Sequence, residues 1–179
     1  GEMSLIDNEP HSATVRAGVQ TDLLVLARAD FARCLPENSS LSYGVMRGLV
    51  EREGLQDRVE VDSAGTGDWH CGNLPDARMR QHAARRGYDL TSRARQVRAE
   101  DFEEFDLILV MDRQNRLDLR EFVRREDDLL RVQLFCEYVT DRAEAEVPDP
   151  YYGGEDGFET VLDLVENGCE GILRKIQAV

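Results

Sequence analysis

The sequence predicts an α/β fold, a three-layer sandwich in which a four-stranded parallel sheet carries helices on both faces. Two observations support this class. Residues 23–26 and 105–111 are nearly continuous aliphatic runs, which are typical of strands buried on both faces. Segments of helical length separate the four predicted strands, as crossovers between parallel strands require. Ligands of such sheets bind beyond the carboxyl ends of the strands.

The first half of the chain predicts two strands and two helices. Residues 1–21 are polar without an apolar period, so we expect a flexible extension before a single domain over residues 22–179. The strand at residues 23–26 leads through a loop into a helix over 41–53. The remaining elements are a strand at 58–62, a loop at 63–67 and a helix at 75–86, with Gly87 as its left-handed cap.

The second half repeats this alternation. Residues 105–111 predict the most hydrophobic strand, and Asp112 is placed to cap a helix that runs to Arg120. Residues 131–135 form a shorter, more polar strand, which we expect near an edge of the sheet. Residues 157–176 predict a long closing helix. Its apolar stripe consists of Phe158, Val161, Leu162, Val165, Cys169, Ile172, Leu173 and Ile176.

Composition excludes several classes of function. A net charge of −14, from 36 acidic and 22 basic residues, disfavours binding to nucleic acid or to an anionic membrane surface. No window approaches the roughly 20 apolar residues of a membrane span, so we expect a cytoplasmic protein. The four cysteines are widely scattered and predict reduced thiols, and the three histidines suggest no metal site. The sequence predicts no cofactor and leaves the oligomeric state open.

The segment at 147–154, Val-Pro-Asp-Pro-Tyr-Tyr-Gly-Gly, holds one carboxylate between two prolines. A stiffly held Asp149 beside aromatic side chains suits a general acid acting on an aryl substrate, since partial burial would raise its pKa. A proline-rich turn whose tyrosines merely pack is the alternative. The only tryptophan, Trp69, could line a groove or cover a core edge, and taken alone it favours the second.

Together these motifs resemble the low-molecular-weight protein tyrosine phosphatases, across roughly residues 22–177. The resemblance rests on residues 61–70, 87–90, 93–96, 101–102, 105–113, 147–154 and 161–171. It implies a metal-independent, two-step removal of phosphate from phosphotyrosine. It also implies that Asp149 is the general acid and that Trp69, Tyr151 and Tyr152 form the walls of an aryl slot.

The phosphate loop departs from the family pattern, which places Cys-x5-Arg-Ser directly after the first strand. Aligned on that strand, Ala27 occupies the position of the nucleophile and Arg33 that of the phosphate-binding arginine. An alanine methyl group cannot form the phosphoenzyme, because the thiolate is the reactive species. Arg33 and Arg28 could still hold an anion. Asp30 replaces an asparagine that shapes the loop and would repel a phosphate.

The residues that support this loop are also changed in part. Ser63 of the bracing network is present, whereas Ser92 stands where the family usually has a histidine. The spacing from Ala27 to the helix around Val45 exceeds the family's by about five residues, which indicates a rebuilt segment.

Three classes of function therefore compete. The first is a pseudophosphatase that binds a phosphotyrosine-bearing protein or a phosphate-like anion without turnover, and the missing Cys-x5-Arg favours it. The second is an active phosphatase that uses Cys34, although the residue six positions beyond Cys34 is Ser40 and no base is evident beside it. The third is an arsenate reductase-like protein, which needs a loop cysteine and two more on a mobile segment. Cys136 and Cys169 are poorly placed for that role.

Overall fold

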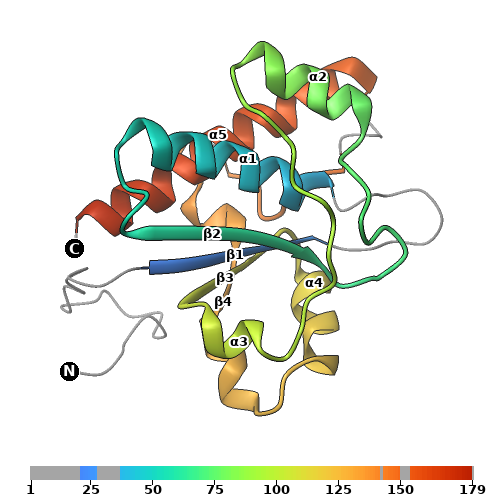
Figure 1. The fold of residues 1–179 in the computed structure, drawn as a ribbon, viewed down its shortest axis with the longest axis vertical. Coiled ribbons are helices and arrows are strands. Elements are labelled where there is room, and N and C mark those ends of the chain that lie inside the picture. The colour runs from blue at the N-terminus through green and yellow to red at the C-terminus, as the bar shows by residue number, and fades with distance from the viewer. Residues whose placement is uncertain (1–20, 28–36, 142, 150–153, 179) are drawn as a thin grey trace.

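The computed structural model describes residues 21–27, 37–141, 143–149 and 154–178. Its centre is a sheet of four strands in the order β2-β1-β3-β4, and every neighbouring pair is parallel (Figure 1). The strands are β1 Thr21–Ala27, β2 Val59–Gly65, β3 Leu107–Val110 and β4 Val132–Leu134. The predicted parallel sheet is confirmed, and β4, the shortest strand, lies at an edge as expected.

Helices cover both faces of this sheet (Figure 1). One face carries α1 Glu37–Arg52 and α5 Gly154–Gln177, with α2 Ala77–Arg85 packed against them. The other face carries two short helices, α3 Asp101–Glu104 and α4 Arg113–Asp118. The 3₁₀ helices are η1 Leu119–Glu121, η2 Glu126–Arg131 and η3 Phe135–Tyr138.

Two hydrophobic cores lie on opposite sides of the sheet, and β3 shows why its sequence is aliphatic throughout. Leu107 and Leu109 belong to the core beneath α1 and α5, whereas Ile108 and Val110 belong to the core on the other face. Alternate residues of a strand point to opposite faces, so a strand buried on both sides has no polar position. The three-layer architecture therefore follows directly from the composition of β3.

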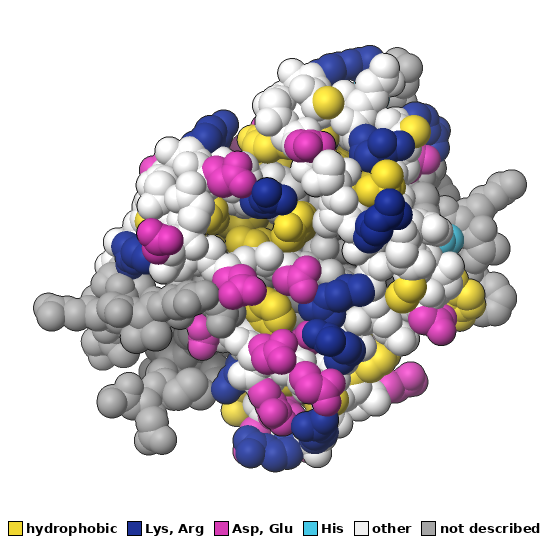
Figure 2. Space-filling model, viewed as in Figure 1, with side chains coloured by type: hydrophobic (Ala, Val, Ile, Leu, Met, Phe, Trp, Pro, Cys, Tyr) yellow, Lys and Arg dark blue, Asp and Glu magenta, His cyan; other side chains and the backbone are white. Residues whose placement is uncertain are grey.

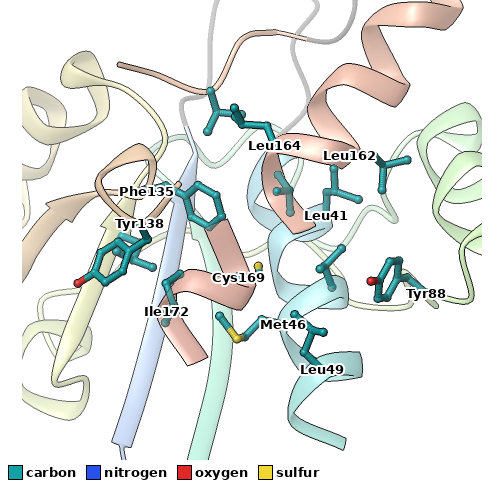
Figure 3. Packing of buried hydrophobic residues seen from close by; sticks show 14 of the residues in the cluster. Leu41, Met46, Leu49, Tyr88, Phe135, Tyr138, Leu162, Leu164, Cys169 and Ile172 are labelled. Atoms are coloured by element: carbon teal, nitrogen blue, oxygen red, sulfur yellow. The ribbon is translucent and has the colours of Figure 1, made fainter. Parts of the chain in front are cut away.

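Helix α5 buries its predicted stripe in the larger core, where its side chains meet those of α1 and η3 (Figure 3). Two glycines let α5 approach η3 closely. A Cβ atom at Gly168 would lie 2.3 Å from the ring of Phe135, and one at Gly171 would lie 2.0 Å from the carbonyl oxygen of Tyr138. Real Cβ atoms do not occupy such distances, so the packing of this layer depends on glycine at both positions.

Several predicted boundaries were wrong. Residues 63–65 do not form a loop: they extend β2, because they pair with the end of β1 and Gly65 also forms a bridge to Gln96. Helix α1 begins four residues before the predicted start, at Glu37, through a polar first turn that has no apolar period. The predicted helix after Asp112 ends at Asp118 and continues as η1. Gly87 has a φ of 85°, as expected of a left-handed cap.

Candidate functional site

The carboxyl ends of β1, β2 and β3 meet at one edge of the sheet. Ala27, the last residue of β1, pairs with Gly65, the last residue of β2, and Leu26 pairs with Val110 at the end of β3. Ligands of parallel α/β sheets bind beyond this edge. The predicted site residues Arg28, Asp30, Arg33 and Cys34 follow directly, and they lie outside the described residues, as do Tyr151 and Tyr152.

The segment that carries Asp149 is fastened to this edge from two sides. The backbone N–H of Val147 donates to the carbonyl oxygen of Met111, directly after β3, at 2.9 Å. The side-chain amide of Asn38, in the first turn of α1, donates to the carbonyl oxygen of Pro148 at 3.2 Å. Asp149 itself is half-buried. The predicted general acid therefore lies at the edge where β1 and β3 end, beside the start of α1.

Asn115 stabilises the same corner, and the sequence analysis missed it. Its side chain is fully buried, and its Oδ1 accepts from the backbone N–H of Met111 at 3.1 Å. Asp112 caps α4 as predicted, accepting from the backbone N–H of Asn115 at 2.7 Å. Met111 is thus held through its N–H by Asn115 and through its carbonyl by Val147. The position of Asn115 three residues after the cap was the only available signal.

The two predicted support residues occupy different environments. Ser63 is buried within β2, in register with Val25 of β1. The hydroxyl of Ser92 is buried and has no hydrogen-bond partner among the residues that the structure describes. A buried hydroxyl without a partner is unfavourable by about 1–3 kcal/mol. The supporting roles of both serines stay predictions, because the loop that they would brace lies outside the described residues.

An ion-pair network centred on the buried carboxylate of Asp101 fixes the segment after Ser92 to β2. Arg95 makes two bonds to the Asp101 carboxylate, at 2.8 and 3.1 Å, and a third to Asp62 at 2.9 Å. Asp101 is fully buried and also accepts from the backbone N–H of Arg98 at 2.8 Å. Burial alone would lower the pKa of Arg95, but its bonds to the two carboxylates raise it above the ordinary value. The segment at residues 95–98 is therefore held rigidly at the carboxyl end of β2.

Trp69 does not cover a core edge. Its side chain is 74% exposed on the loop that follows β2, which corrects the interpretation favoured for this residue alone. An exposed indole is available for contact with an aryl ligand. Whether it forms one wall of a slot stays a prediction, because the two tyrosines predicted to face it are not described.

The described cysteines differ in exposure. Cys71 is exposed, whereas Cys136 and Cys169 are buried. Burial raises the pKa of Cys136 to about 11 and that of Cys169 further, so both are thiols rather than thiolates near neutral pH. Among the residues that the structure describes, no group of three or more His, Cys, Asp and Glu side chains is arranged to hold a metal ion. No helix in the described ranges is long and apolar enough to cross a membrane.

Comparison with known proteins identifies the family to which this architecture belongs. The sequence model of the low molecular weight phosphotyrosine protein phosphatases matches residues 36–179. A putative low molecular weight protein-tyrosine-phosphatase of Synechocystis, slr0328, is 40% identical over 138 residues, which cover 77% of this chain and 88% of the relative. YfkJ, a low molecular weight protein-tyrosine-phosphatase of Bacillus subtilis, is 36% identical over 140 residues, covering 78% and 88%.

Solved structures agree with this result. A crystal structure of a protein tyrosine phosphatase from Entamoeba histolytica, with Hepes in the active site, superposes with a TM-score of 0.78 at 34% identity and covers 88% of this chain and 97% of that one. The crystal structure of YfkJ superposes with a TM-score of 0.77, covering 89% and 96%. The chain belongs to the low molecular weight phosphotyrosine protein phosphatase family.

Proposed function

We propose that this chain is a pseudophosphatase of its family: it binds an aryl phosphate, such as the phosphotyrosine of a partner protein, without hydrolysing it. The single observation that carries the proposal is Ala27 in the position of the nucleophile. A covalent phosphoenzyme needs a thiolate at the start of the phosphate loop, and an alanine methyl group has no lone pair with which to attack phosphorus.

The position of Ala27 supports this assignment. It is the last residue of β1 and pairs with the last residue of β2, at the edge where the family's loop begins. The match to the family's sequence model starts only at residue 36, beyond Ala27, Arg28 and Arg33. A match that begins at residue 36 is expected when the whole preceding segment differs from the family, and not when a single residue is exchanged.

The parts that would bind the ligand are better preserved. The segment with Asp149 is attached to β3 and α1 by hydrogen bonds, and Trp69 exposes its indole on the neighbouring loop. Arg33 and Arg28 supply the guanidinium groups that an anion requires. In this proposal Asp149 has the position of the general acid, and Trp69 lines the aryl slot with Tyr151 and Tyr152.

The other cysteines do not supply a substitute chemistry. Cys136 and Cys169 are buried thiols with raised pKa values, so they are poor partners for the disulfide relay of an arsenate reductase. Of the other two thiols, the exposed Cys71 lies on the loop after β2, so the candidate nucleophile within the phosphate-loop segment is Cys34. Its use would need a second loop register, in which the residue six positions later is Ser40 and not arginine.

The decisive experiment combines turnover with binding. We expect no hydrolysis of para-nitrophenyl phosphate above the buffer rate between about pH 5 and 6, because Ala27 offers no nucleophile to the phosphate. We expect phosphotyrosine to quench or shift the fluorescence of Trp69, the only tryptophan, in a saturable titration that Arg33→Ala abolishes. The matched control is Arg52→Ala, which removes an exposed arginine from the last turn of α1.

Two outcomes would overturn the proposal. Turnover that disappears in Cys34→Ser would establish an active phosphatase in the second register. Absence of a saturable phosphotyrosine signal would remove the binding function. We also expect Ala27→Cys alone to leave hydrolysis negligible, because Asp30 and the altered spacing remain. Recovery to ordinary phosphatase rates in that variant would show that the rest of the loop is competent.

A further inference from the structure

A surface groove of about 560 Å³ separates α2 from the segment that follows it. One wall is a stripe of α2 at helical spacing, and the other consists of three consecutive residues after Gly87, with Leu74 beside them. The α2 wall is formed by Ala77, Arg80, Gln81 and Ala84, and the opposite wall by Asp89, Leu90 and Thr91. Ala77, Ala84 and Leu90 make much of the lining apolar.

The groove begins beside the candidate site. After Gly87 the chain runs back along α2 towards the segment that precedes this helix. Two backbone hydrogen bonds join the two segments: the N–H of Gly72 donates to the carbonyl oxygen of Ala94 at 2.8 Å, and the N–H of Ala94 donates to the carbonyl oxygen of Asn73 at 2.9 Å. Thr91 and Leu74 therefore lie at the end of the groove that adjoins Ser92 and the loop of Trp69. The pair Ala84 and Asp89 lies at the far end.

Arg80 gives the groove a positive charge that no carboxylate of the described residues neutralises by an ion pair. Within the described residues, Arg80 has no carboxylate within 4.0 Å; its Nε donates to the carbonyl oxygen of Pro75 at 3.1 Å. Arg93, near the same end, is likewise exposed and donates to the carbonyl oxygen of Gly72 at 2.6 Å. By contrast, Arg86 is bonded to three carboxylates. In a chain of net charge −14, Arg80 and Arg93 therefore form a local positive patch, and the one acidic residue of the groove lining is Asp89 on the opposite wall.

The surface view agrees with this distribution. Figure 2 shows Lys and Arg side chains interspersed with hydrophobic ones over the part of the molecule that holds α2, whereas the opposite end carries many acidic side chains together with further Lys and Arg. Leu74 contributes an apolar side chain that is 38% exposed. A ligand that combines negative charge with apolar contact matches this surface.

We propose that the groove binds an extended segment of the partner polypeptide beside its phosphotyrosine, with an acidic side chain facing Arg80 and an apolar one over Leu74 and Ala77. This inference rests on the proposed function, because it extends the same site. The α2 wall runs over eight residues, Ala77 to Ala84, or about 10 Å of helix axis, which corresponds to about three residues of extended peptide. Asp89 at the far end disfavours a second acidic residue there.

The test uses the full chain and three synthetic peptides in fluorescence anisotropy at low salt. The first carries phosphotyrosine with glutamates and leucines on both sides, the second replaces every glutamate by glutamine, and the third is the first peptide without phosphate. We expect the glutamine peptide to bind about 2- to 5-fold more weakly, the range of one or two exposed ion pairs. In Arg80→Glu and Arg80→Gln the two phosphopeptides should bind alike, whereas Arg52→Glu keeps the difference.

The outcomes separate the groove from the phosphotyrosine site. Equal binding of both phosphopeptides by the unaltered chain, with no effect of Arg80→Glu, overturns the groove and leaves the proposed function standing. Binding of the unphosphorylated acidic peptide as tightly as the phosphopeptide, lost in Arg80→Glu, supports the groove and contradicts phosphotyrosine binding. Absence of binding by all three peptides overturns both.

Discussion

Replacing Asp101 by alanine should destabilise the protein strongly, because it removes the buried carboxylate at the centre of an ion-pair network. The carboxylate is fully buried and accepts two bonds from Arg95 and one from the backbone of Arg98. Removing one partner of a buried pair typically costs about 3–5 kcal/mol. Arg95 keeps its bond to Asp62 and remains 26% exposed, so we expect the lower end, about 3 kcal/mol.

Urea unfolding followed by circular dichroism would measure this loss. In a thermal melt followed in the same way, the loss should lower the melting temperature by about 6–12 °C, since about 1 kcal/mol corresponds to about 2–4 °C in a domain of this size. The matched control is Glu103→Ala in the same helix, α3. Glu103 is 66% exposed and pairs with Arg124 at 3.0 Å, an arrangement worth less than about 1 kcal/mol. Equal stability of the two variants would show that the network contributes no more than a surface pair.

Two further predictions concern α5. Gly171→Ala should lower the free energy of unfolding by about 1–3 kcal/mol, because the new Cβ would lie 2.0 Å from the carbonyl oxygen of Tyr138. This range already allows for the better helix propensity of alanine. A variant as stable as the parent in urea would contradict this packing. Hydrogen bonds from His82 and Arg86 hold the pKa of Glu159 below its ordinary value of 4.5. Its stabilisation is therefore present above pH 4.5 and is lost as pH falls through the lowered value. Unfolding curves from pH 7 to 3 should show Glu159→Gln less stable than the parent at pH 7, with the difference shrinking below pH 4.5; a constant difference would refute the assignment.

The sheet could be predicted from sequence because its signal is local. The two central strands, β1 and β3, contain short aliphatic runs. Burial on two faces leaves such a run without a polar position, as β3 shows. The stripe of α5 is equally local, since helical spacing alone places Phe158 and Leu162 on one face. Boundaries were less predictable because they depend on partners. Gly65 extends β2 only because β1 and Gln96 pair with it.

The small helix α3 had no readable signal. Four residues cannot form a stable helix alone, since helix nucleation is unfavourable and so short a helix has too few backbone hydrogen bonds to compensate for it. What fixes α3 is Asp101, whose carboxylate meets Arg95 and the backbone of Arg98. A run of acidic residues in a sequence usually indicates a solvated turn. The burial of the Asp101 carboxylate could not be inferred from the sequence, because it depends on the contact between the segment at residues 95–98 and β2.

In the candidate site, the chemical type of a residue could be predicted from sequence, whereas the contacts that position it could not. Asp149 could be proposed as the general acid from sequence, because two prolines flank this carboxylate and aromatic residues follow it. The groups that position it were not, since Asn38 lies 110 residues from Pro148 in sequence and Asn115 reaches the segment only through Met111. Neither of these two anchors involves Ala27, so an alanine at that position leaves both in place. The proposed loss of the nucleophile is therefore compatible with an acid segment that stays fixed to the sheet, which is the structural condition for binding without turnover.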